Sequence, residues 1–190
     1  MKTPTPAGTY RVASIGQHVS KWKYPLSKIP WGTKLIRKGD RFEVDLKGKR
    51  QDVEKLTGAS ADWVLRTYKL LYKMTDAPTE WLFNDFGHLT VYLYVDKNKD
   101  GRWDRKQEPR LSEFIHTTPN DEAAEHLARA KGIEPSYNLG ESHGCVHVRP
   151  GDIDTAVSAG YLKANQLFVV HPQRSLHEVP KRCAEHWSAL

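Results

Sequence analysis

An alternating pattern over residues 89–95 most constrains the fold of this 190-residue chain. The residues run Leu89, Thr90, Val91, Tyr92, Leu93, Tyr94 and Val95. Successive side chains of a strand point to opposite faces, so this period of two predicts a β-strand with one buried face. Shorter strands are predicted over 8–12, 41–46 and 166–171. We therefore expect a fold built mainly on β-sheet.

Helix signals are fewer and lie between these strands. Ser60 is a candidate N-cap for a helix running to about residue 73, and Asn120 for a second helix that ends before Gly132. A short helix is expected over 152–159 and a terminal helix after Pro180. The pattern predicts a mainly β, α+β fold with one domain over residues 1–175 and a helical tail over 176–190.

The net charge and the hydropathy of the chain restrict the kinds of partner that it is expected to bind. The chain has a net charge of +6, with basic residues densest over 34–41 and 47–50. This suits an anionic polymer, but no recognition helix or aromatic RNA-binding pattern accompanies the basic clusters, so we expect no nucleic acid. No apolar run approaches the length of a membrane span, and no apolar stretch follows Met1, so neither a span nor a signal peptide is expected. We expect a monomer.

The six residues SHGCVH at 142–147 are the stretch that indicates chemistry. A cysteine attacks as its thiolate, so a histidine that takes its proton would make Cys145 a nucleophile. The preceding glycine lets the backbone approach a bound carbonyl, and the N–H groups of Gly144 and Cys145 could hold an oxyanion. With only Cys183 besides it, Cys145 belongs to no disulfide framework. The pattern favours a cysteine-nucleophile enzyme.

Zinc binding is the rival interpretation of the same residues. His143, Cys145 and His147 would face one side of a strand with N, S and N donors. Ligands spaced by two along a flat strand are splayed rather than tetrahedral, and no CxxC or HxxxH pair supplies a fourth donor. Catalysis is favoured, and zinc and an inert buried thiol stay as alternatives.

Residues 96–104, DKNKDGRWD, match the first nine positions of a calcium-binding loop. The candidate ligands are Asp96, Asn98, Asp100, Arg102 and Asp104. The twelfth position holds Gln107, and Glu108 comes one place late, so the bidentate carboxylate is missing unless the loop bulges. A structural Ca²⁺ and a metal-free polar hairpin turn are both compatible with this pattern.

Four segments, in order, resemble the L,D-transpeptidases with a YkuD-type catalytic domain. They are TPTPAGTY at 3–10, Phe86-Gly87 before a strand, FIHTT at 114–118, and SHGC at 142–145 continued by VHVRPGDI at 146–153. The matches span residues 3–171, and the SHGC box with an upstream IH pair is their most specific part. The resemblance implies a YkuD-like β-sandwich with short helices, located in the periplasm or cell envelope, or secreted.

The resemblance also implies roles for the matched residues. Cys145 would be the nucleophile and His116 its base, with the carbonyl of Thr117 orienting the imidazole. The oxyanion would be held by backbone N–H groups around His143, Gly144 and Cys145. The substrate side would be formed by Ser142, which also shapes the turn, and by His147 and Arg149. The family usually has arginine or asparagine where this chain has His147, so carboxylate recognition would rest on Arg149 or on a titrating His147.

The implied reaction is acyl transfer on peptidoglycan stem peptides, with no cofactor required. The thiol attacks the carbonyl of the third stem residue, usually diaminopimelate, and releases the terminal D-alanine. An amine then resolves the acyl-enzyme into a crosslink, or water resolves it in a carboxypeptidase reaction. Two other functions stay open: a secreted antibacterial toxin with L,D-carboxypeptidase or D-amino-acid exchange activity, and a calcium-stiffened wall-binding module without turnover.

Two insertions distinguish this chain from the family pattern. The spacing from His116 to Cys145 is longer than usual, and the excess, residues 119–133, coincides with the helix predicted after Asn120. This insertion is either a lid over the cleft or a packing element. A second insertion covers about 47–75. Because the chain begins at the TPxG element, we expect residues 21–73 to complete the first sheet.

Overall fold

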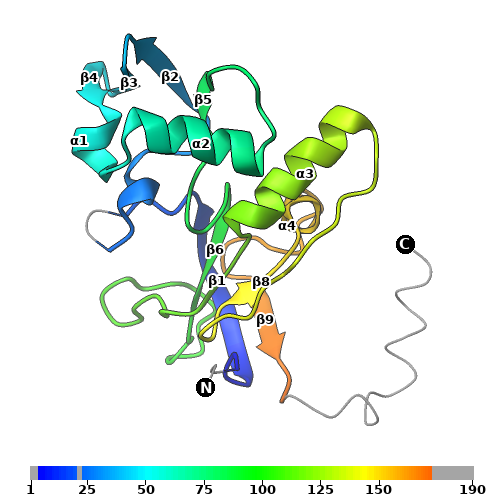
Figure 1. Cartoon of the computed structure of the whole chain (residues 1–190). Helices are drawn as coiled ribbons and strands as arrows, with labels where there is room; N and C mark the ends of the chain where they lie inside the picture. Colours follow the sequence, from blue (N-terminus) through cyan, green and yellow to red (C-terminus); the bar gives the residue numbers. More distant parts are fainter. Residues whose placement is uncertain (1–3, 21–22, 173–190) are drawn as a thin grey trace.

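The computed structural model describes residues 4–20 and 23–172, which form two β-sheets with several short helices (Figure 1). The predicted mainly β, α+β fold class is confirmed. The predicted tail at 176–190, the helix after Pro180 and Cys183 lie outside the described residues. No helix in the described ranges is long and apolar enough to cross a membrane.

The larger sheet has five strands in the order β8-β7-β6-β1-β9. They are β1 (Gly8–Gly16), β6 (Thr90–Tyr94), β7 (Phe114–His116), β8 (Val146–His147) and β9 (Leu167–Val170). Neighbouring strands are antiparallel except β7 and β8, which run parallel. The parallel pair sets His116 opposite His147.

The prediction that the strand at 89–95 buries a single face is wrong. Val91 and Leu93 are buried, as expected, but Thr90 and Tyr94 are fully buried as well. β6 lies in the middle of the sheet, between β7 and β1, and the ring of Tyr94 packs near Trp103. Tyrosine and threonine can line a buried face, so alternation alone could not show that both sides are covered.

The two faces of the larger sheet carry different side chains. One face packs its apolar residues against Ile153 of α4 (Pro150–Ser158). The other carries aromatic rings, where Phe114 lies 5.0 Å from Phe86 and 5.3 Å from His116 between ring centroids. His116 is therefore enclosed in an aromatic layer on the face away from α4.

The smaller sheet has the order β4-β3-β2-β5. Its strands are β2 (Thr33–Lys38), β3 (Arg41–Leu46), β4 (Lys49–Asp52) and β5 (Glu80–Trp81), accompanied by the 3-10 turn η1 (Pro25–Lys28), α1 (Val53–Thr57) and α2 (Ala61–Leu71). A separate hydrophobic cluster joins these elements and includes the buried residues Phe42, Val64 and Trp81. The expectation that residues 21–73 complete the first sheet is wrong, because β9 completes it and β2–β4 form a second sheet.

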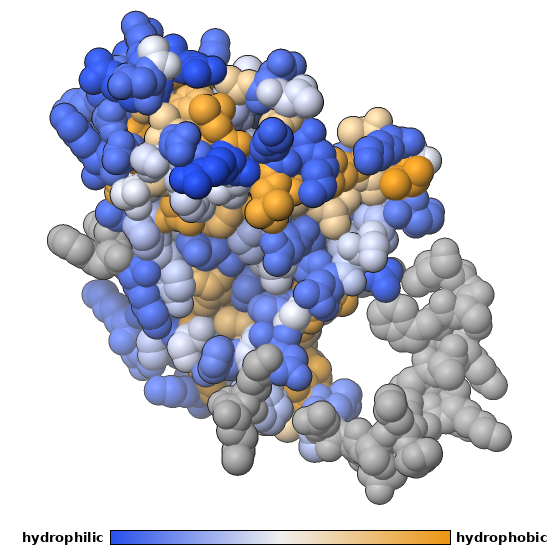
Figure 2. Space-filling view, viewed as in Figure 1, coloured by the Kyte–Doolittle hydropathy of each residue, from blue (hydrophilic) through white to orange (hydrophobic). Residues whose placement is uncertain are grey.

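Hydrophilic residues predominate at the end of the molecule that holds the smaller sheet, with some hydrophobic residues visible between them (Figures 1 and 2). The exposed basic residues there are Lys34, Arg37, Lys38, Arg41, Lys47, Lys49 and Arg50. Glu43 on β3 is within ion-pair distance of Arg41 and Arg50, which offsets part of the positive charge. The two basic clusters of the sequence thus belong to the strands and turns of one sheet.

Helix boundaries follow the capping residues closely. Ser60 caps α2 as predicted, accepting the backbone N–H of Trp63. α3 (Pro119–Lys131) ends at Gly132 as predicted, but its N-cap is Thr118 rather than Asn120. α4 begins at Pro150, two residues earlier than predicted, because proline is well suited to the first turn of a helix.

Candidate active site

The turn that carries Cys145 is fixed by contacts to its own backbone. Cys145 is a half-buried free thiol immediately before β8. Its carbonyl oxygen accepts hydrogen bonds from the hydroxyls of Ser142, at 2.5 Å, and Thr5, at 3.4 Å. Gly144 has φ +113°, and a Cβ there would come within 2.9 Å of the Glu113 side chain, so the turn requires glycine.

His116 is held in one tautomer. The side chain is buried at the end of β7, and its Nδ1 lies 2.6 Å from the carbonyl oxygen of Thr117. A carbonyl can only accept, so Nδ1 carries the proton and Nε2 keeps its lone pair. Burial is the main cause that lowers the pKa of His116 to about 4, although the bond to Thr117 opposes it. The imidazole is neutral at pH 7 and can accept a proton at Nε2.

His147 lies against His116, with ring centroids 4.7 Å apart in an edge-on arrangement. Its Nδ1 donates to the carbonyl of Gly140. His143, in contrast, is exposed on the turn. The structure therefore brings together His116 and His147, and it leaves His143 at the surface.

The thiol of Cys145 is protonated at rest. Burial raises the pKa of the Cys145 thiol above its usual value, and the nearby carboxylate of Glu113 adds to the rise. A hydrogen bond with the backbone of Phe114 opposes these effects without reversing them. A nucleophilic Cys145 thus needs a base that removes its proton during attack, rather than a preformed thiolate.

Arg149 stands at the surface just before α4. Its guanidinium lies over the ring of Tyr137, 5.4 Å from the centroid, and its Nε is 3.9 Å from a carboxylate oxygen of Asp152. The side chain is 56 % exposed. An anionic ligand can therefore reach the guanidinium without displacing buried structure.

α3 holds the segment that leads into the SHGC turn. The carboxylate of Asp121 accepts the backbone N–H of Asn138 at 2.8 Å, and Glu125 accepts the hydroxyl of Tyr137. Nothing in the sequence around Asp121 indicates this contact. Its partner lies 17 positions away, and no local pattern connects the two.

His88 is a site residue that the sequence analysis missed. Its Nδ1 lies 2.6 Å from Glu122 of α3, and its Nε2 lies 2.8 Å from Asp154 of α4. Burial lowers the pKa of His88, but the hydrogen bonds and charges of the two carboxylates together outweigh burial and raise it to about 9. His88 is therefore cationic at neutral pH. Its place directly after Phe86-Gly87 was the only sequence signal.

The candidate calcium loop is closed by protein donors. One oxygen of Asp96 accepts from Arg11 at 2.8 Å, and Glu108 accepts the N–H groups of Lys97 and Asp104. The other Asp96 oxygen is buried without a hydrogen-bond partner among the described residues. Asp96 thus offers one free carboxylate oxygen, whereas Ca²⁺ takes about six to eight oxygen ligands. Within the described part of the chain, no group of three or more His, Cys, Asp or Glu is placed to hold a metal ion, so neither calcium nor zinc gains support.

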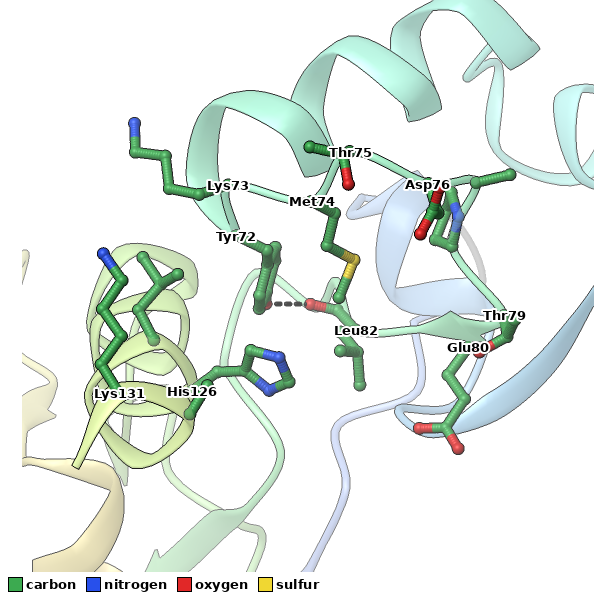
Figure 3. A pocket seen from close by; sticks show the side chains of 14 residues that line it. Tyr72, Lys73, Met74, Thr75, Asp76, Thr79, Glu80, Leu82, His126 and Lys131 are labelled. Atoms are coloured by element: carbon green, nitrogen blue, oxygen red, sulfur yellow. Dashed lines mark hydrogen bonds between the residues drawn. The ribbon is translucent and has the colours of Figure 1, made fainter.

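A cavity of about 590 Å³ lies between the end of α2, the loop 73–82 and α3 (Figure 3). Tyr72, Met74 and Leu82 line it on one side, and His126 of α3 points in from the other. None of its described lining residues belongs to the SHGC turn, β7 or β8. The cavity is separate from the site around Cys145.

A two-sheet domain that places a neutral histidine on β7 and a free cysteine directly before the parallel strand β8 has the parts of a cysteine acyl-transfer enzyme. Residues 1–159 match the YkuD family, described as the L,D-transpeptidase catalytic domain. Because this match covers most of the chain, the protein belongs to that family. Catalysis in this family requires no cofactor, and members of the family act on peptidoglycan peptides. No curated protein and no solved structure matches the chain.

Proposed function

We propose that this protein is a peptidoglycan L,D-transpeptidase with Cys145 as nucleophile and His116 as general base. One observation carries the proposal. The parallel pairing of β7 and β8 brings His116, with Nε2 unprotonated, beside the strand that follows Cys145, in a chain of the YkuD family. The same observation favours an enzyme over a wall-binding module, which would not need a neutral, oriented imidazole.

The first half-reaction acylates the enzyme. His116 Nε2 takes the proton of the Cys145 thiol while the sulfur attacks the carbonyl of the third stem residue, for which we expect diaminopimelate. Proton transfer and attack are coupled because the resting thiol is protonated and the resting imidazole is neutral. The carbonyl of Thr117 accepts from Nδ1 throughout and stabilises the imidazolium that forms.

The tetrahedral intermediate needs donors at the turn. Backbone N–H groups around His143, Gly144 and Cys145 are the candidates for holding the oxyanion. The Gly144 N–H lies 3.3 Å from the Ser142 hydroxyl oxygen at rest, a long bond that it can exchange for the oxyanion. The imidazolium of His116 then protonates the departing D-alanine amine. The C–N bond breaks, and a thioester on Cys145 remains.

The second half-reaction resolves the thioester. An acceptor amine, or water, gives a proton to His116 Nε2 and attacks the acyl carbon, and the thiol leaves with that proton. An amine produces a crosslink and water a shortened stem. Arg149 and His147 are the candidates for the substrate carboxylate: Arg149 is exposed and permanently charged, and His147 lies beside the base.

The test is acylation by synthetic tetrapeptide stems, followed as a mass adduct on the intact protein. Cys145→Ala should give no adduct, and His116→Ala should slow adduct formation by about 10²- to 10⁴-fold, the range for a lost general base. His126→Ala is the matched histidine control, because His126 lies at the separate cavity. An adduct that survives Cys145→Ala, or an equal loss in His126→Ala, contradicts the proposal.

Incubation with purified sacculi distinguishes attack on the thioester by an amine from attack by water. Mass profiling of muropeptides should reveal new crosslinked dimers if an amine is the acceptor. Tripeptide stems without dimers would identify the protein as an L,D-carboxypeptidase, the activity expected of a toxin. Intact tetrapeptide stems would reject both.

A further inference from the structure

We propose that Glu122 on α3 is a positioning residue for His116, acting through the hydroxyl and the carbonyl of Thr117. This inference rests on the proposed function, in which His116 is the base. It gives the 119–133 insertion a role other than a lid or a packing element: α3 supports the orientation of the catalytic imidazole.

Thr117 connects the base to α3. It is fully buried, and its carbonyl oxygen lies 2.6 Å from His116 Nδ1. Its hydroxyl donates to Glu122 Oε1. The same residue thus bonds the imidazole through its main chain and α3 through its side chain, so a displacement of the side chain turns the peptide that holds the imidazole.

Residues outside α3 hold the carboxylate of Glu122 in place. Its side chain is 6 % exposed, and Oε1 also accepts the backbone N–H of His88 at 3.0 Å and His88 Nδ1 at 2.6 Å. His88 in turn bonds Asp154 of α4. The carboxylate therefore has a cationic partner and three donors, and the loop before β6, α3 and α4 all hold it in place.

The backbone at Gly87 has no room for a side chain beside this contact. Gly87 has φ +68°, and a Cβ there would overlap the hydroxyl of Thr117 and Oε1 of Glu122. Glycine at this position lets the loop close directly onto the pair. The Phe86-Gly87 pair, seen in the sequence only as a motif, is thus part of the support of the base.

The expected effect is on the chemical step. An imidazole turned away from its productive orientation transfers protons more slowly, and misplacement by about 1 Å costs up to about a hundredfold in rate. Thr117→Val keeps the carbonyl and the shape and removes only the hydroxyl. We expect it to lower kcat for acylation about tenfold with KM changed less than about twofold. Thr117→Ser, which restores a hydroxyl, should recover most of the rate.

The matched control is Thr57→Val. Thr57 is also buried, and its hydroxyl bonds Val53 and Ala59 in the smaller sheet's core. Both valine variants lose one satisfied buried hydroxyl, so their melting temperatures should fall by similar amounts, but only Thr117→Val should lose kcat. If Thr117→Val does not fold, Glu122→Gln, which is isosteric and removes the charge, takes its place and should lower kcat in the same way.

Three kinetic results overturn the inference. The first is an unchanged kcat in Thr117→Val, or in Glu122→Gln if that variant has to replace it. The second is a Thr117→Ser variant that is as slow as Thr117→Val. The third is a loss of kcat in Thr57→Val equal to that in Thr117→Val. Each would show that the hydroxyl contact does not orient the base.

A readout without substrate separates this inference from the proposed function. Nitrogen NMR of labelled His116 should show a single Nδ1-protonated tautomer in the wild-type protein and a mixture in Thr117→Val. An unchanged spectrum in that variant overturns the positioning role. If the spectrum changes in Thr117→Val but the wild-type protein forms no acyl-enzyme, the proposed function is rejected and the positioning role stays supported.

Discussion

Protonation of His88 should contribute more to the stability of the folded protein in mild acid than in alkali. Its pKa rises from 6.5 to about 9 on folding, since bonds to Glu122 and Asp154 outweigh the cost of burial. The folded state therefore binds this proton more tightly than the unfolded chain. His88→Gln, which keeps a polar side chain but cannot carry the charge, is the perturbation that removes the effect.

The sign and the pH window follow from these two pKa values. Below pH 6.5 both states hold the proton, and the full stabilisation is present. Between 6.5 and about 9 the unfolded chain releases the proton first, and above 9 both states are neutral and the contribution is gone. This difference between the folded-state and unfolded-state pKa of His88 corresponds to about 3 kcal/mol of unfolding free energy. The side chain is 21 % exposed, so solvent screening removes a minor part.

Urea unfolding of the wild-type protein and of His88→Gln at about pH 6 and about pH 10 measures this contribution. The variant should lose about 3 kcal/mol more at the lower pH than at the higher one. Other groups titrate in this range in both proteins, and they cancel in the difference. His126→Gln, a substitution at the separate cavity, is the matched histidine control. A deficit in His88→Gln that is the same at both pH values refutes the reasoning.

Three further substitutions or measurements test the structure. Gly87→Ala should lower the melting temperature much more than Gly39→Ala, because both glycines have positive φ but only Gly87 faces atoms in the space of a Cβ; equal losses would contradict this. Ser60→Ala should cost about 1 kcal/mol in urea unfolding by removing the cap of α2, and a change near zero would argue against that cap. Alkylation of Cys145 by iodoacetamide should be slow at pH 7 and rise into the alkaline range, since burial raises the thiol pKa, and a pH profile with its midpoint below about 8 would contradict a protonated resting thiol.

Local signals in the sequence predicted much of the framework. Alternation marked β6, and capping residues marked the start of α2 and the end of α3, because these features depend on neighbours a few positions apart. The motif residues Cys145 and His116 were likewise identified by their neighbours, through resemblance to a family. Their roles stay predictions until the acylation assay is done.

Contacts between distant segments were beyond this kind of inference. No sequence pattern indicates a role for His88, because its two carboxylate partners lie 34 and 66 positions away. Of the smaller sheet, only the strand at 41–46 was predicted, and its neighbours β2 and β4 were not. The strands β2 and β4 are short and rich in charged residues, so their apolar face is too brief to produce a clear alternation.

The long spacing between His116 and Cys145 is explained by the first turns of α3. Residues Asp121 and Glu125 hold the segment that enters the SHGC turn, while Glu122, between them, bonds Thr117 behind the base. A single stretch of helix therefore bonds the residue after His116 and the segment that leads to Cys145. An insertion that only decorated the surface would have few buried acids, yet Asp121 and Glu122 are both buried and bonded to other elements. Residues 119–133 are thus better understood as part of the scaffold that sets the active site than as a tolerated addition.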